Sequence, residues 1–235
     1  QEAVRAELGA KNARLAMIGP GGENLVRYAC VINDLKHAAG RTGMGAVMGS
    51  KNLKCVAALG RTAIPLANED GVKALAKSMV DTWKDKAWGM HELGTAGGLT
   101  GLSKVGALPT RNFQDGQFEG AENIGGERMR DTILIDRGGC YACPIRCKRV
   151  VEVHDDEYDV NPIYGGPEYE TLGALGSVCG VDDLRAVAKA NELCNAYSLD
   201  TISTGMVIAF AMECFENELL TPEDTGGLEL RFGNA

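Results

Sequence analysis

Three cysteines lie within eight residues of the segment GGCYACPIRCKRV (138–150): Cys140, Cys143 and Cys147. Their C-x2-C-x3-C spacing allows the thiolates to converge on one side of a tight turn, an arrangement that suits soft metal centres. A four-iron cluster takes four cysteines, often three local ones and one remote. The segment therefore predicts a metal site that lacks one local ligand, or else a loop of reduced structural cysteines.

Zinc is the main alternative to an iron–sulfur cluster. Structural zinc usually takes its ligands in two pairs, and no second C-x2-C or H-x3-5-H pair follows in this sequence. His154 is the only histidine nearby, and Cys179, the nearest further cysteine, lies in the apolar context GALGSVCGVDD. The spacing favours iron–sulfur over zinc but leaves both open, and the fourth ligand is expected outside this sequence.

Two basic residues, Lys148 and Arg149, follow the last of these cysteines. Their charge would offset that of a thiolate-bound cluster and raise its reduction potential. A solvated basic pair is the alternative.

The glycine-rich stretch GRTGMGAVMGSKNLK (40–54) is a second candidate site. It is not a P-loop, because Gly45 and Gly49 are followed by Ser-Lys, and its glycine gaps do not fit the dinucleotide fingerprint. Backbone amides without a Cβ can still approach an anion closely, and Arg41 and Lys51 add positive charge. The stretch predicts an anion-binding turn or a tight glycine turn without a ligand.

Periodicity indicates the elements that position these residues. Apolar runs at 14–19 and 53–60 predict buried strands, with a short helix between the two glycine-rich stretches that separate them. Residues 68–88 have acids at their start and helical apolar spacing, which predicts a helix. From residue 167 the pattern is strongly helical, with Asp182 and Asp200 as expected N-caps. The apolar stripes behind these caps are Leu184, Val187, Ala188 and Cys194, and then Ile202, Met206, Ala209, Phe210 and Phe215.

The expected fold is therefore mainly α-helical with a short α+β unit at the N-terminus. We expect the division near residue 61, which gives segments 1–61 and 62–235. The composition, 45% apolar and 24% charged, is that of a soluble globular protein. The net charge of −8 argues against nucleic-acid binding. The longest apolar run, 206–215, is too short to span a membrane.

The chain begins with Gln and has no signal peptide, so we expect a segment of a longer polypeptide. Five of its eight cysteines lie in apolar or helical contexts, where free cysteine behaves as a small hydrophobic residue. Without a secretory signal, a reducing cytoplasm is the expected compartment.

Four stretches together resemble the tungsten-containing aldehyde:ferredoxin oxidoreductase family, and they occur in the family's order. They are GRTGMGAVMGSKNLK (40–54), LPTRNFQ (108–114), CYACPIRCKR (140–149) and GPEYETLGALGSVCGVDDLRAVAKANELCNAYSLDTIS (166–203). The resemblance covers essentially the whole chain but only the middle of a family protein. It implies that 1–61 is the C-terminal part of a β-rich pterin-binding domain and that 62–235 is most of a helical domain.

The resemblance also implies cofactors and partners. Family members hold tungsten, or rarely molybdenum, between two pterins, with a [4Fe-4S] cluster close by. They oxidise an aldehyde and water to a carboxylate and pass electrons to ferredoxin. A small aldehyde and ferredoxin are therefore the expected partners, with a homodimer or a larger complex as the expected assembly. Cys140, Cys143 and Cys147 would be three cluster ligands, and the fourth would lie beyond Ala235.

By the same resemblance, the glycine-rich turn around Gly43 would approach the pterin phosphates. Arg41 would contact them, and the Thr42 carbonyl would lie near a bridging magnesium ion. NAYSLD (195–200) is similar to the family's D-x-x-G-L-D/C pterin motif, although Asn and Ser replace its Asp and Gly. Its residues that would hydrogen-bond a pterin are Asn195, Leu199 and Asp200.

In GPEYET (166–171), Glu170 corresponds to a carboxylate that faces the metal site in the family, with Tyr169 beside it. Glu170 would accept a proton when water adds to the aldehyde carbon. Glu168 is expected only to open a helix and interact with its dipole. None of the three histidines is assigned to catalysis.

Two other functions stay open. The tungsten subunit of a benzoyl-coenzyme A ring reductase shares the fold and the cluster of this family. A non-catalytic zinc-binding or interaction module would instead hold tetrahedral zinc at the cysteines and no pterin.

Overall fold

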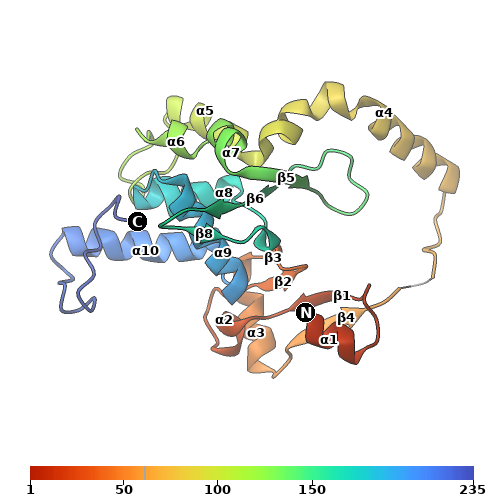
Figure 1. Ribbon diagram of the computed structural model, residues 1–235, viewed down its shortest axis with the longest axis horizontal. Coiled ribbons are helices and arrows are strands. Elements are labelled where there is room, and N and C mark those ends of the chain that lie inside the picture. The colour runs from red at the N-terminus through yellow and green to blue at the C-terminus, as the bar shows by residue number, and fades with distance from the viewer. Residues whose placement is uncertain (61) are drawn as a thin grey trace.

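The structure, a computed structural model, describes residues 1–60 and 62–235, so the expected division near residue 61 falls on the one residue outside the described part. The described chain is helix-rich, with small antiparallel sheets (Figure 1). Its helices are α1 (Glu2–Glu7), α2 (Pro20–Glu23), α3 (Met44–Ser50), α4 (Glu69–Leu93), α5 (Leu99–Lys104), α6 (Ala121–Ile124), α7 (Gly126–Thr132), α8 (Tyr169–Thr171), α9 (Leu184–Tyr197) and α10 (Thr201–Glu216). Its strands are β1 (Arg14–Met17), β2 (Val31–Asn33), β3 (His37–Ala39), β4 (Cys55–Ala58), β5 (Leu134–Gly138), β6 (Lys148–Val151), β7 (Val153–His154) and β8 (Asp159–Val160).

The N-terminal sheet has the strand order β3-β2-β1-β4, and each neighbouring pair is antiparallel. Its buried side chains include Leu15 on β1 and Ile32 on β2. Both predicted strands exist, but β4 is an edge strand whose Val56 is 55% exposed, so the prediction that this strand is buried was wrong. Apolar composition marked β4 as a strand, whereas its burial depends on a neighbour that the sheet lacks on that side.

The helix expected between the two glycine-rich stretches is absent from the described residues there. Strands β2 and β3 occupy that interval, and the helices α2 and α3 form within the glycine-rich stretches themselves. These two helices pack at backbone distance. A Cβ on Gly49 would overlap the carbonyl oxygen of Gly22, and one on Gly45 would lie 2.5 Å from that of Cys30. Close packing, rather than ligand contact, therefore explains these two glycines.

This packing gives a first prediction. Gly49→Ala is expected to lower the free energy of unfolding by about 1–3 kcal/mol, because the added methyl has no room between α2 and α3. Urea unfolding measures the change. Gly101→Ala on α5 is the matched control, because its Cβ would meet no atom within 4 Å. That variant is expected to be as stable as the parent or slightly more stable. Equal stability of the two variants would contradict the close approach.

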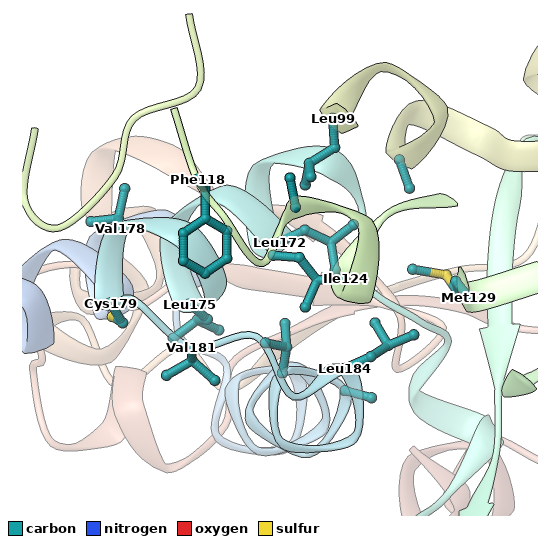
Figure 2. Packing of buried hydrophobic residues seen from close by; sticks show 14 of the residues in the cluster. Leu99, Phe118, Ile124, Met129, Leu172, Leu175, Val178, Cys179, Val181 and Leu184 are labelled. Atoms are coloured by element: carbon teal, nitrogen blue, oxygen red, sulfur yellow. The ribbon is translucent and has the colours of Figure 1, made fainter. Parts of the chain in front are cut away.

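The second part of the chain packs around one hydrophobic core (Figure 2). Side chains of α5, α6 and α7 meet those of the segment 172–181, which begins with a π-helical turn at Leu172–Gly176, and those of α9 and α10. The most deeply buried of these side chains include Leu99, Leu108, Ile124, Met129, Leu172, Val178 and Val187. The β5–β6 and β7–β8 hairpins lie in this part as well, so the second segment is helix-rich but mixed rather than all α.

The predicted helix faces are largely confirmed. All four stripe residues of α9 are buried, as are Ala209 and Phe215 of α10, but Phe210 is 63% exposed, so its prediction was wrong. Asp200 caps α10 as predicted. The cap of α9 is Asp183 rather than Asp182, because Asp183 accepts the Arg185 N–H at 2.8 Å. Asp182 instead accepts a side-chain hydrogen bond from Asn123.

The predicted helix at 68–88 is α4, which continues to Leu93. Asn68 caps it by accepting the Gly71 N–H at 2.8 Å. None of the residues in α4 is buried, and Figure 1 shows the helix extending away from the rest of the chain. Its C-terminal turn contacts the cysteine loop through His91, and the Glu92 carbonyl there accepts a hydrogen bond from Arg149 on β6. No helix in the described residues has the length and apolar character needed to cross a membrane.

Candidate functional site

A cavity of about 970 Å³ lies where the N-terminal sheet, the β5–β6 hairpin and the helices α8 to α10 meet. Its volume is in the range of sites that hold cofactor-sized ligands. Predicted site residues in its lining are Arg41, Cys140, Glu170, Asn195, Leu199 and Asp200. The other predicted residues, which neighbour the lining in sequence without belonging to it, are Thr42, Gly43, Cys143, Cys147 and Tyr169. The fold therefore brings together residues that are up to 159 positions apart in sequence.

Arg41 and Asp200 form an ion pair at the cavity wall. The Arg41 Nη1 lies 3.0 Å from Asp200 Oδ2, and the Asp200 side chain is 6% exposed while that of Arg41 is 61% exposed. Asp200 also accepts the Ser203 N–H and hydroxyl as the N-cap of α10. Most of the hydrogen-bonding capacity of Asp200 is thus used inside the protein. Asp200 orients Arg41, and the guanidinium of Arg41 remains available to an anion in the cavity.

The NAYSLD segment joins the helical part of the chain to the N-terminal unit. The Cys30 N–H donates to Ser198 O at 2.8 Å, and the Asp200 N–H donates to Tyr28 O at 3.1 Å. Ser198 is buried in the left-handed region, with φ 58° and ψ 53°. The family motif has Gly at this position. A glycine is consistent with the left-handed backbone of Ser198, because glycine adopts that conformation without strain.

Asn195 lines the cavity and donates its side-chain N–H to Tyr164 O at 2.8 Å. This bond fixes the direction of the amide. Its carbonyl oxygen and second N–H remain to accept from and donate to a ligand.

The turn at Arg41–Gly43 has an unusual backbone. Gly43 has φ +70°, and a Cβ there would collide with the Arg27 carbonyl, so this position requires glycine. Thr42 also has a positive φ, 78°, which is rare for a β-branched residue. Backbone conformations of this kind persist where the surrounding structure imposes them, and they are frequent at ligand sites.

The three clustered cysteines lie on the loop that joins β5 to β6. Cys140 is exposed and borders the cavity, and Cys143 and Cys147 are half-buried. The Cys143 N–H donates to Cys140 O at 3.1 Å, which closes a turn around Ala142. No three His, Cys, Asp or Glu side chains among the described residues are gathered closely enough to hold a metal ion.

The buried cysteines are chemically different. Burial raises the pKa of Cys30 and of Cys179 to about 12, and that of Cys194 to about 11. Cys179 also donates its S–H towards Ala174 O, 3.3 Å away in the core. Because its side chain is enclosed in the hydrophobic core, Cys179 is not placed to be the fourth ligand of a site on the loop.

This contrast predicts the order of alkylation. In the metal-free protein at pH 8, iodoacetamide is expected to label the loop cysteines rapidly. Cys30 and Cys179 are expected to stay unlabelled until the protein unfolds, because about one thiol in ten thousand is ionised when the pKa is 12. Peptide mass spectrometry measures the rates. Labelling of Cys179 as fast as that of Cys140 would contradict the assignment of Cys179 to the core.

Glu170 and Tyr169 begin α8. Glu170 is exposed and lines the cavity, and none of the hydrogen bonds or ion pairs found among the described residues uses its carboxylate. Tyr169 instead packs against the hydrophobic core, and burial raises the pKa of its hydroxyl. Glu170 thus presents its carboxylate to the cavity, and Tyr169 beside it contacts the core.

Sequence reasoning missed a polar group at the cavity. Glu168 pairs with Lys148 Nζ at 3.2 Å and accepts the Thr95 hydroxyl at 2.5 Å. Glu168 opens α8 as its N-cap residue, as predicted, although its side chain makes no cap hydrogen bond and is used in these two other contacts. His37 also lines the cavity, where burial and the charges of Lys148 and Lys36 hold its pKa below the ordinary value. No local sequence pattern links these residues, because they come from four separate segments.

The chemistry of these residues fits a pterin cofactor in the cavity and an iron–sulfur cluster at the cysteine loop. The cavity offers a guanidinium, amide groups and glycine backbone to a polar anionic ligand of cofactor size. The loop offers three accessible thiols, whereas the buried cysteines are kept protonated by their surroundings. These features define a candidate cofactor site next to a candidate thiolate site.

Comparison with known proteins agrees with that definition. The family model described as aldehyde ferredoxin oxidoreductase, N-terminal domain, matches residues 1–60, and the one described as domains 2 & 3 matches residues 73–235. The chain belongs to the aldehyde ferredoxin oxidoreductase family, as the four sequence stretches predicted.

Individual relatives are consistent with this membership. The tungsten-containing aldehyde ferredoxin oxidoreductase of Thermococcus kodakarensis is 40% identical over 100% of this chain and 38% of the relative. The WOR-like subunit of an aliphatic sulfonate oxidoreductase of Pyrococcus furiosus is 33% identical over 95% of this chain and 36% of the relative. The active site complex BamBC of benzoyl coenzyme A reductase, solved with 1,5 dienoyl-CoA, shares the fold. Its TM-score is 0.73 at 22% identity, over 98% of this chain and 37% of that chain. The chain thus spans less than two-fifths of the length of these proteins.

Proposed function

We propose that the intact protein is an oxidoreductase that converts an aldehyde and water into a carboxylate and passes the electrons to ferredoxin. The observation that supports this most is the shared cavity, which brings Arg41, Asp200 and Glu170 together with Cys140. Aldehyde is the favoured substrate because the more similar relatives are aldehyde ferredoxin oxidoreductases. Tungsten or molybdenum with two pterins, and a [4Fe-4S] cluster, would supply the oxidation and the electron transfer.

The N-terminal segment 1–61 is, in this proposal, the last part of the pterin-binding domain, and 62–235 is a helical domain. The two family-model matches, to 1–60 and 73–235, support this division. The cytoplasm is the proposed compartment, which is supported by eight free cysteines. A homodimer or a larger complex remains the proposed assembly.

The residues around the cavity would bind and orient the pterin. Arg41, held by Asp200, would pair with a phosphate, and the carbonyl of Thr42, whose φ is 78°, would be a ligand for magnesium. Asn195 would accept from and donate to a pterin ring with the groups that Tyr164 leaves free. Leu199, which pairs with Ala29, would offer its backbone. Because Asp200 is already engaged, its main contribution would be to position Arg41.

Glu170 would act on the proton of the substrate water. Its carboxylate oxygens border the cavity and lie outside the ion-pair network of Glu168 and Lys148. An ionised carboxylate within reach of a water molecule can accept its proton as the water attacks a carbonyl carbon. Cys140, Cys143 and Cys147 would each supply one thiolate to the cluster.

An activity assay tests this proposal. The intact protein, purified without oxygen, is incubated with a panel of aldehydes and either ferredoxin or a viologen dye. Aldehyde-dependent reduction of the acceptor with formation of the carboxylate is expected. Conversion of benzoyl-coenzyme A to a dienoyl product, with no turnover of any aldehyde, would replace the proposal with the ring-reductase alternative.

A further inference from the structure

Three consecutive carbonyl groups of the cysteine loop are held by side chains from outside it. His91 Nδ1 lies 2.6 Å from Ile145 O, and since a carbonyl only accepts, this nitrogen carries the proton. Arg149 donates from Nη2 to Arg146 O at 3.2 Å and from Nε to Cys147 O at 3.1 Å. The backbone on either side of the third cysteine is therefore fixed on the side of the molecule where α4 lies (Figure 1).

The same guanidinium also binds the end of α4. Arg149 donates from Nη1 to Glu92 O and from Nη2 to His91 O, both at 2.8 Å. The last carbonyls of a helix have no partner within the helix, and its C-terminus attracts positive charge. Arg137 adds a bond to His91 O at 3.0 Å. Arg149 thus connects the cysteine loop to the C-terminal end of α4.

The surroundings leave Arg149 little freedom. Arg149 is 3% exposed, although arginine is seldom buried without partners. A Cβ on Gly94, the residue after α4, would lie 2.8 Å from Cys147 O and 2.9 Å from Arg149 Nε. Only glycine at position 94 leaves room for this contact. The alternative of a solvated basic pair at Lys148 and Arg149 is therefore wrong for Arg149, and the partly exposed Lys148 pairs with Glu168.

We propose that Arg149, with His91, is a positioning residue that sets the backbone of the cysteine loop for cluster binding and places a fixed positive charge beside the cluster. This inference rests on the proposed function, because it assumes that the three loop cysteines bind a cluster. The hydrogen bonds of Arg149 and His91 to the loop and to α4, here called the clamp, need no metal, because they join only groups of this chain. The clamp therefore predicts a property of the metal-free protein as well as of the loaded one.

Two variants of Arg149 separate geometry from charge. Arg149→Gln loses both the planar set of N–H donors of the guanidinium and its charge. Arg149→Lys keeps the charge but loses the planar donor set. In the metal-free intact protein, both are expected to speed amide hydrogen exchange across residues 143–148 by about tenfold or more. In the loaded protein, Arg149→Gln is expected to lower the reduction potential of the cluster and to bind less iron. Arg149→Lys is expected to lose iron without the full shift in potential.

The control is Arg130→Gln on α7, because Arg130 is exposed and, among the described residues, its side chain bonds only to its neighbour Asp131. It is expected to change neither exchange in the loop nor the potential. If Arg149→Gln does not fold, Arg149→Lys and His91→Ala decide the matter, since each removes part of the clamp. Loop exchange and potential at the parent values in the folded variants would overturn the proposal. A full cluster in Cys143→Ser would instead overturn the ligand assignment on which the proposal rests.

Discussion

Cys143→Ser is expected to remove the iron–sulfur cluster from the intact protein. Cys143 is the middle cysteine of the β5–β6 loop, and its N–H closes the turn onto Cys140. A serine hydroxyl is a poor replacement for a thiolate on iron, so the variant would keep at most two of the three local ligands. Iron is expected to fall from about four atoms per chain to near zero. The visible absorbance of the cluster and the reduction of ferredoxin are expected to disappear with it.

Cys214→Ser is the control for this result. Cys214 is half-buried on α10 and lies far along the chain from the loop, so its replacement is expected to leave the iron content unchanged. Iron analysis and absorbance of the two variants, purified in parallel without oxygen, measure the difference. A full cluster signal in Cys143→Ser would show that the loop cysteine is not a ligand.

Asp200→Ala is expected to have the second largest effect, on stability and on the cavity together. Asp200 caps α10, accepts the Ser203 hydroxyl at 2.6 Å and holds Arg41 at 3.0 Å. Removing a buried carboxylate with several charge-assisted hydrogen bonds should lower the free energy of unfolding by about 2–4 kcal/mol. The freed Arg41 should also bind an anion in the cavity less well. Asp200→Asn, which can still cap the helix, should lower the free energy of unfolding by about half as much or less.

Asp183→Ala gives a matched comparison. Asp183 caps α9 in the same way, but its side chain is 31% exposed and pairs with the surface residue Arg185. Its loss should cost about 1 kcal/mol, the usual value for an N-cap. Urea unfolding of both variants, with tungsten content as a second readout, tests the difference. An equal loss of unfolding free energy in the two variants would mean that the burial of Asp200 and its pair with Arg41 do not add to stability.

Local patterns predicted the elements best. The acids and apolar spacing of 68–88 gave α4, and the stripe from Leu184 to Cys194 gave the buried face of α9, because both depend on periodicity within one helix. The predictions for β4 and Phe210 were wrong in their burial, and for the same reason. Whether an apolar side chain is covered depends on a neighbouring element, and the residue's own segment does not specify that neighbour.

The candidate site was found from sequence mainly through motifs rather than contacts. Arg41 and Asp200 were both predicted, but only the structure shows that one orients the other across 159 positions. Arg149 shows more clearly that motifs do not reveal such contacts. Its position next to a cysteine suggested only charge, whereas its four carbonyl partners come from the end of α4 and from the loop. Such long-range contacts depend on the packing of whole elements, which a local pattern does not encode.

Metal analysis of the intact protein, purified without oxygen, tests the central claim most directly. The account predicts tungsten, or molybdenum in its place, together with about four or more iron atoms per chain. Zinc alone, with neither tungsten nor iron, would contradict the account and would favour a zinc-binding module at Cys140, Cys143 and Cys147.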